Sequence, residues 1–214
     1  EDVLIIEDAA YREIQFSDER ISPIKALDKE NRRVAYIRST SKEVAPFRIG
    51  YSVVPRELRP EVVKAKGYMD LNTPAITQLI VEEYYRRYFE EHIKYVRDGY
   101  RKRRDAMKRS IDESFPAGSR TDPRGGFFIW WNSEDRNFDS KKFLEEIALK
   151  NDIAYVPGSA FFPPLGYAYI PEERKITRMR PETHGMRLSY SYLDPDTIAE
   201  GITRLGKLLA SVIG

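Results

Sequence analysis

The sequence contains no cysteine and only two histidines, and these absences exclude several kinds of site. Without cysteine there can be no disulfide, no zinc–thiolate site and no cysteine nucleophile. With His92 and His184 as the two histidines, a metal centre built from several imidazoles is disfavoured, and we expect no metal. The chemistry of this chain is therefore expected to come from other side chains.

Long apolar runs and a charge excess of one sign are also missing. No apolar stretch approaches the roughly 20 residues that cross a bilayer, and no signal peptide is recognisable. Lys and Arg total 36 against 34 for Asp and Glu, so the charge indicates neither nucleic acid nor acidic lipid as a partner. These features predict a cytoplasmic protein without a membrane or nucleic-acid partner.

The start of the chain has the pattern of a buried strand. It begins without methionine, and Glu1 and Asp2 are followed at once by the apolar run 3–6, with no preceding turn or helix-capping residue. We interpret the sequence as a segment of a longer protein that begins within a domain.

Short apolar runs separated by polar turns predict an α/β arrangement in the first part of the chain. Their nearly all-apolar character is typical of strands covered on both faces by helices. The predicted elements are strands at 3–6, 34–37 and 49–54, followed by a helix at 56–67.

A long helical stretch from Thr73 to Ser114 separates this part from the rest, with a possible interruption near residues 89–92. Beyond it the pattern becomes α+β, and we place a domain boundary near residue 90. The predicted later elements are strands at 127–131, 153–156 and 186–191 and helices at 139–150 and 194–211.

Lys42 lies in a hydroxyl-rich turn directly after the predicted strand 34–37. An ordinary surface lysine is the simplest interpretation. An amine at the edge of an α/β sheet, where such folds bind ligands, is also placed to attack a carbonyl and form a Schiff base. Arg48 follows six residues later, and together with Ser39 and Ser41 it would make a small anion site suited to phosphate.

Asp8 and Arg187 also allow two interpretations each. Asp8, with Tyr11 close behind it, follows the first predicted strand, where an aspartate is usually a helix cap or turn former. Arg187 interrupts the otherwise apolar strand 186–191. It is either an exposed or paired side chain or, if it points inward, a planar fork for a carboxylate.

Five motifs occur in order, at residues 5–11, 39–42 with 45–50, 123–130, 156–162 and 186–191. Together they resemble the fold-type I aminotransferases of class I/II, within the group of kynurenine, 2-aminoadipate and aromatic or branched-chain aminotransferases. The resemblance covers essentially the whole chain. It implies an α/β fold in which residues 1–90 are the second half of a large mixed-sheet cofactor domain and residues 91–214 are a smaller α+β domain.

The resemblance implies pyridoxal 5'-phosphate as the cofactor. Lys42 would bind it covalently and then move a proton between the substrate α-carbon and the cofactor. Asp8 would keep the pyridine nitrogen protonated. Tyr11 would donate a hydrogen bond to the phenolic oxygen of the ring.

The resemblance also implies how the charged groups of cofactor and substrate are bound. Ser39 and Arg48 would bind the phosphate, while Ser41 would shape the turn. Arg187 would bind the substrate α-carboxylate and so orient the bond that is broken.

These roles predict an aminotransferase that exchanges an amino group between an α-amino acid and a 2-oxo acid, expected to be 2-oxoglutarate, and that acts as a homodimer. Two alternatives stay open. The chain could be the effector domain of a GntR-like transcription regulator, which has the same fold, or a cofactor-free subunit whose role is dimerisation or assembly. The sequence does not predict which amino acid is the substrate.

The sequence departs from the family pattern in three places. The loop between Pro46 and Arg48 is one residue shorter than usual. The connection from Pro163 to His184 is longer and more highly charged, which predicts a flap or surface insertion. The N-terminal half of the family is missing, so we expect these 214 residues alone to be inactive and unable to hold the cofactor properly.

Overall fold

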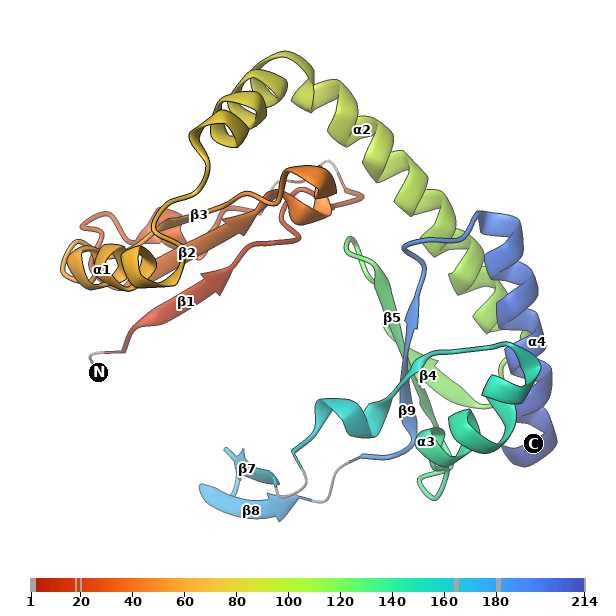
Figure 1. The fold of residues 1–214 in the computed structure, drawn as a ribbon. Coiled ribbons are helices and arrows are strands. Elements are labelled where there is room, and N and C mark those ends of the chain that lie inside the picture. The colour runs from red at the N-terminus through yellow and green to blue at the C-terminus, as the bar shows by residue number, and fades with distance from the viewer. Residues whose placement is uncertain (1–2, 18, 20, 164–165, 180–181, 214) are drawn as a thin grey trace. The chain divides into compact units, whose positions relative to one another are not determined.

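The computed structural model describes residues 3–17, 19, 21–163, 166–179 and 182–213 (Figure 1). The chain forms two compact units. The first unit comprises Glu1–Asp98 with Arg124–Gly126, and the second comprises Gly99–Pro123 with Phe127–Gly214. The domain boundary near residue 90 stays a prediction.

A three-stranded mixed sheet is the centre of the first unit. Strands β1 (Ile5–Asp8) and β2 (Val34–Ser39) are parallel, and β3 (Gly50–Val53) pairs with β2 in the antiparallel sense. The three strands therefore form where the apolar runs predicted them. Short 3-10 helices lie at Ile24–Leu27, Thr40–Lys42 and Ala45–Phe47, and helix α1 spans Arg59–Met69.

The sheet of the first unit is less covered than its apolar sequence predicts. Val34 and Ala35 of β2 are buried, but Ile6 of β1 is 66% exposed and every residue of β3 is exposed. The prediction of strands covered on both faces is therefore wrong for β1 and β3 in this chain. Burying both faces of such a sheet requires helices on each side, and all residues of α1 are exposed.

Helix α2 is continuous from Ala75 to Ser114, so the predicted interruption at residues 89–92 is wrong. That segment contains neither glycine nor proline, and its glutamates favour the helix. Tertiary packing also stabilises the helix next to residues 89–92, because Ile93, a residue of the first unit, is only 1% exposed.

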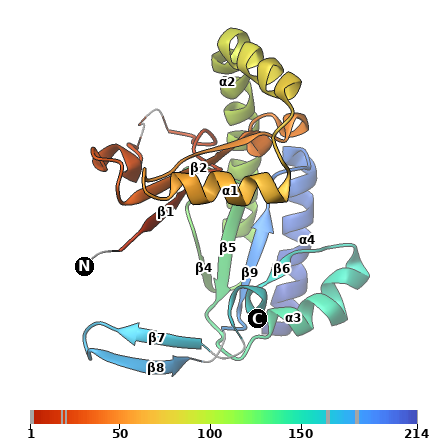
Figure 2. The ribbon, with the colours of Figure 1, turned by 60° about the vertical axis from the view of Figure 1, so that its left-hand side comes forward.

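A four-stranded antiparallel sheet is the centre of the second unit (Figure 2). In its strand β5 (Phe128–Ser133) alternate residues point into the core, with Ile129 and Trp131 buried. The strand order is β4 (Gly118–Arg120), β5 (Phe128–Ser133), β9 (Gly185–Ser189) and β6 (Val156–Pro157).

Helix α4 (Pro195–Ile213) has one apolar face, and that face is buried in the second unit. Its start is fixed by Asp194, whose carboxylate accepts hydrogen bonds from the backbone amides of residues 196 and 197. The buried residues follow the helical repeat and are Ile198, Ile202, Leu205 and Leu209.

Two further segments of the second unit connect these strands. The predicted helix 139–150 forms as α3 (Ser140–Phe143), a π-helical turn (Leu144–Ala148) and a 3-10 turn (Leu149–Asn151), and another 3-10 turn follows at Gly158–Phe161. The long connection 163–184 contains a hairpin of β7 (Gly166–Ile170) and β8 (Lys175–Met179). Pro164, Leu165, Arg180 and Pro181 of that connection lie outside the described residues.

None of the helices in the described part of the chain combines the length and apolarity that crossing a bilayer requires.

Two glycines of α4 test how closely this helix packs. A Cβ added at Gly206 would lie 2.4 Å from the carbonyl oxygen of Ser114, whereas one at Gly201 would have no neighbour within 4 Å. We expect Gly206→Ala to lower the free energy of unfolding by about 1–3 kcal/mol. Gly201→Ala should raise it by about 0.4–1 kcal/mol, because alanine loses less chain entropy in a helix. Urea denaturation measures both, and equal effects would contradict the close packing at Gly206.

Candidate functional site

Four of the candidate residues lie at or just beyond the carboxyl ends of the two parallel strands. Asp8 is the last residue of β1 and pairs with Ile37 of β2. Ser39 ends β2, Lys42 ends the 3-10 turn that follows it, and Tyr11 comes just after β1. Open α/β sheets bind ligands beyond the carboxyl ends of their strands, so this edge is where a ligand is expected.

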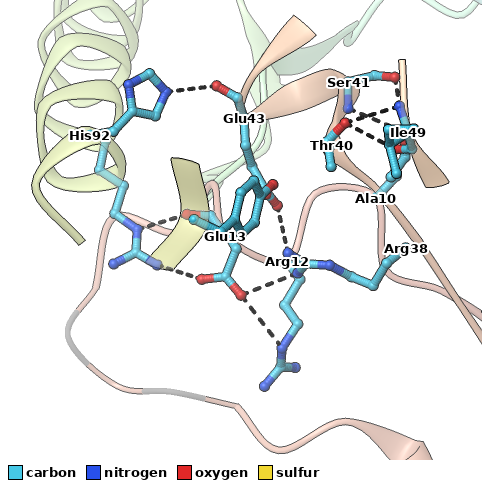
Figure 3. Close-up of polar contacts among 12 residues, drawn as sticks. Ala10, Arg12, Glu13, Arg38, Thr40, Ser41, Glu43, Ile49 and His92 are labelled. Carbon is cyan, nitrogen blue, oxygen red and sulfur yellow. Dashed lines mark hydrogen bonds and ion pairs between the residues drawn. The ribbon is translucent and has the colours of Figure 1, made fainter. Parts of the chain in front are cut away.

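Thr40 closes the loop that carries Lys42 and Arg48. The backbone amide of Thr40 donates to the carbonyl of Ile49 at 2.8 Å, and its hydroxyl donates to the same oxygen at 2.9 Å. The hydroxyl also accepts from the amide of Ile49 at 3.3 Å (Figure 3). Because Thr40 is only 3% exposed, these bonds fix the base of the loop 40–49 in the protein interior.

The predicted anion-binding side chains contact one another on this loop. The Ser39 hydroxyl donates to the Ser41 hydroxyl at 2.9 Å, and Arg48 Nη1 donates to the same Ser41 oxygen at 2.8 Å. The Ser39 oxygen also accepts the amide of Ser41 and caps the 3-10 turn, so both serines shape the turn. Two hydroxyls and a guanidinium gathered in this way have the donor chemistry that a phosphate requires.

Arg48 adopts the left-handed conformation, with φ +51° and ψ 37°. For a residue with a side chain this conformation costs roughly 1–2 kcal/mol, and it is usually left to glycine. This residue lies just before β3, which begins at Gly50. Arg48 therefore contacts Ser41 from a strained backbone conformation.

Lys42 and Tyr11 are neighbours in the structure. The Lys42 ammonium lies 5.3 Å from the centroid of the Tyr11 ring. Asp8 Oδ1 accepts the backbone amide of Ala10 at 3.1 Å, which shapes the turn between Asp8 and Tyr11. Asp8 is thus a turn former, as one of the two interpretations of the sequence held, and it lies at the carboxyl end of β1.

Arg187 belongs to the second unit, where it lies between two aromatic rings. Its guanidinium carbon is 4.1 Å from the Phe128 centroid and 4.8 Å from the Phe161 centroid. Its Nε is buried and has no hydrogen-bond partner within the part of the chain that the structure describes. A buried donor of this kind suits a bound anion such as a carboxylate. The stacking of Phe161 on Arg187 could not be read from the sequence.

A buried polar cluster behind the loop 40–49 was not predicted. Glu43, the residue after Lys42, is paired with Arg38, an arginine within the apolar strand β2 (Figure 3). Burial raises the pKa of the Glu43 carboxyl, against the opposing effects of the Tyr85 hydroxyl and Arg38. The predicted strand ended at residue 37, so Arg38 was expected in the polar turn, whereas β2 continues to Ser39 and includes it. We define the Glu43 cluster as Glu13, Arg38, Glu43, Tyr85, His92 and Arg97.

Comparison with known proteins identifies the family and the fold of this chain. Residues 1–204 match the family described as aminotransferase class I and II. The chain belongs to this family. The aromatic-amino-acid aminotransferase 1 of Thermococcus litoralis is 36% identical over 97% of this chain, which covers 46% of that protein.

A solved aminotransferase structure also has the same fold. It is the alpha-aminoadipate aminotransferase of Thermus thermophilus, complexed with N-(5'-phosphopyridoxyl)-L-leucine. The TM-score is 0.82 at 32% identity, over 97% of this chain and 50% of that one. The predicted α/β fold of a fold-type I aminotransferase is therefore confirmed. The chain spans about half the length of the aminotransferases that it matches.

A transcription regulator is also similar to this aminotransferase-family chain. The uncharacterized HTH-type transcriptional regulator YisV of Bacillus subtilis is 30% identical over 94% of the chain, which covers 38% of that protein. The family fold alone therefore does not distinguish an enzyme from the effector part of a regulator.

Thr40→Val tests the closure of the loop. We expect this change to lower the free energy of unfolding by about 1–3 kcal/mol, because the Ile49 amide loses a buried acceptor. The control is Thr121→Val, in which the lost hydroxyl accepts the Trp130 amide at an exposed position where water can replace it. Urea denaturation compares the two variants. Equal losses would show that Thr40 contributes no more than a surface threonine.

Proposed function

We propose that the full-length protein is a pyridoxal-phosphate-dependent aminotransferase and that this chain supplies Lys42 as the cofactor-binding lysine. The observation that carries the proposal is the single closed loop that presents Lys42 together with Ser39, Ser41 and Arg48 at the carboxyl edge of a parallel strand pair. A structurally similar aminotransferase is complexed with a phosphopyridoxyl amino acid, which supports the same cofactor here.

The residues present fit this cofactor. Ser39, Ser41 and Arg48 form a donor set whose chemistry matches a phosphate dianion. When bound, pyridoxal phosphate supplies an electron sink for the charge that develops at the substrate α-carbon. Lys42 would hold the cofactor through its amine and carry the proton that leaves the α-carbon.

Asp8 and Tyr11 would hold the ring of the cofactor. A carboxylate at Asp8 favours a proton on the pyridine nitrogen, because opposite charges stabilise one another. The Tyr11 hydroxyl would donate a hydrogen bond to the phenolic oxygen. The closeness of Tyr11 to the Lys42 ammonium supports these roles for the two residues at the end of β1.

Arg187 would bind the α-carboxylate of the amino acid. Its guanidinium lies over the Phe128 and Phe161 rings, and its buried Nε has no hydrogen-bond partner among the described residues. A planar fork binds a carboxylate through two parallel hydrogen bonds, which orients the α-carbon for loss of its proton. The amino acid, 2-oxoglutarate as the acceptor and the homodimer remain predictions.

The effector part of a transcription regulator is the second candidate, and the similarity to YisV favours it. Such a protein would carry a DNA-binding domain ahead of this chain. Specific DNA binding by the full-length protein, without turnover of any amino acid, would favour the regulator over the enzyme.

Lys42→Ala tests the central assignment. In the full-length protein we expect the variant to lose transamination of an amino acid panel with 2-oxoglutarate, because no amine remains to hold the cofactor and move the proton. Borohydride reduction followed by peptide mass spectrometry should locate the cofactor on Lys42 in the unmodified protein. The matched control is Lys66→Ala, an exposed lysine of α1 that pairs with Asp70. Cofactor fixed on another lysine would contradict the assignment.

Arg187→Lys tests the substrate carboxylate site. Lysine keeps the charge but loses the planar fork and its stacking, so we expect the KM for the amino acid to rise about tenfold or more. Steady-state kinetics of the full-length enzyme measures the change. Arg204→Lys, at an exposed arginine of α4 that donates to the Asn151 carbonyl, serves as the control. An unchanged KM in Arg187→Lys would remove Arg187 from the substrate site.

A further inference from the structure

The residue after Lys42 is a buried acid that the proposed chemistry does not use. The side chain of Glu43 is 0% exposed. Glu43 Oε1 accepts Arg38 Nη2 at 2.7 Å, and Oε2 accepts the Tyr85 hydroxyl at 2.5 Å. Both carboxylate oxygens are therefore hydrogen-bonded to side chains from other elements, one from β2 and one from α2.

The Glu43 cluster extends from this residue to the segment after β1. Arg38 also pairs with Glu13 at 3.1 Å, so its guanidinium links two carboxylates. Arg97 donates from Nη2 to Glu13 Oε2 at 3.0 Å and from Nε to the Glu13 carbonyl at 2.7 Å. Glu13 also pairs with Arg12 at 3.9 Å, so each of the two acids has a basic partner, which makes their burial tolerable.

Helix α2 supplies one side of the cluster. Tyr85 donates to the Glu43 carboxylate, His92 Nε2 lies 2.8 Å from the Glu43 carbonyl oxygen, and Arg97 binds Glu13. The first two residues are seven positions apart in the helix and so lie on one face of it. The helix therefore holds both the side chain and the backbone of Glu43.

The backbone of Lys42 is consequently fixed on both sides. Thr40, two residues before it, is buried and bonded to Ile49, and Glu43, directly after it, is buried in the cluster. The amides of Glu43 and Val44 both donate to the Thr40 carbonyl, at 3.1 and 2.7 Å. Lys42 itself is only partly buried, so its side chain extends from a short segment whose neighbours are held in the interior.

We propose that Glu43 is a positioning residue for Lys42, holding the lysine's backbone in place through Arg38 of β2 and through Tyr85 and His92 of α2. The inference rests on the proposed function, since only a reacting lysine needs such placement. The general reason is that a catalytic group must be held to within a fraction of an ångström by its supporting residues.

The test uses the full-length protein and three variants. Glu43→Ala removes both hydrogen bonds, Glu43→Gln removes the charge but keeps hydrogen-bonding atoms at both ends, and Tyr85→Phe removes one bond while keeping the ring that stacks on Phe89. Asp112→Asn is the matched control. Asp112 also lies on α2, but in the second unit, where it pairs with Arg120.

The first measurement is hydrogen exchange of the cofactor-free protein. In Glu43→Ala we expect amides of the loop 40–49 to exchange about tenfold faster or more, with the rest of the chain changed less. Tyr85→Phe should give a smaller local increase, and Glu43→Gln should restore slow exchange. The proposal would be overturned if exchange in Glu43→Ala increased evenly over the whole chain. It would also be overturned if the loop 40–49 exchanged as slowly in Glu43→Ala as in Asp112→Asn. If Glu43→Ala does not fold, the exchange rate of the loop 40–49 in Tyr85→Phe tests the proposal instead.

The second measurement is steady-state transamination. A displaced Lys42 should lower kcat by about tenfold or more in Glu43→Ala with little change in KM, because the loss falls on the reacting geometry. Glu43→Gln should recover most of kcat. A raised KM at unchanged kcat would overturn the positioning role. If the unmodified protein shows no transamination but Glu43→Ala speeds exchange in the loop 40–49 as expected, the proposed function is wrong. The role of Glu43 in fixing the loop is then still supported.

Discussion

The buried ion pair between Glu43 and Arg38 is the interaction on which the candidate site depends most. Charges removed from water are tolerated only with close partners. Besides each other, Arg38 pairs with Glu13 after β1, and Glu43 accepts a hydrogen bond from Tyr85 of α2. Meeting that requirement brings β2, the segment after β1 and helix α2 to one place. The loop with Lys42 and Arg48 starts beside this pair, so its position follows from the burial of Glu43.

The same loop combines a rigid base with local strain. Thr40 and Ile49 close it with three hydrogen bonds, and the left-handed Arg48 lies just inside that closure. A strained residue persists only where its surroundings hold it. The buried base and the Glu43 cluster provide that support, and Arg48 can therefore face Ser41 without a glycine in the turn.

Arg187 is supported by a different physical device. In the second unit two aromatic rings hold the guanidinium, while its buried Nε is left without a protein acceptor among the described residues. Stacking fixes the plane of the group without using its donors, so these stay available to a ligand. The chain belongs to the aminotransferase family, and its similarity to a regulator leaves the use of this fold to experiment.

The sequence by itself determined strands β1, β2, β3, β5 and β9 and the turn with Lys42, because apolar runs, capping hydroxyls and turn residues act over a few neighbours. It missed β4, β7 and β8, and its predicted strand 153–156 was wrong, since β6 spans only Val156–Pro157. The resemblance to aminotransferases grouped Asp8, Tyr11, Ser39 and Arg48 as cofactor-binding residues, and the structure shows that β1 and β2, which precede them, are parallel. Only the tertiary structure decided that α2 runs unbroken, that Phe161 stacks on Arg187 and that Glu43 is buried. Those outcomes depend on contacts between distant residues, such as the bond from Tyr85 to Glu43 across 42 positions, which no local pattern records.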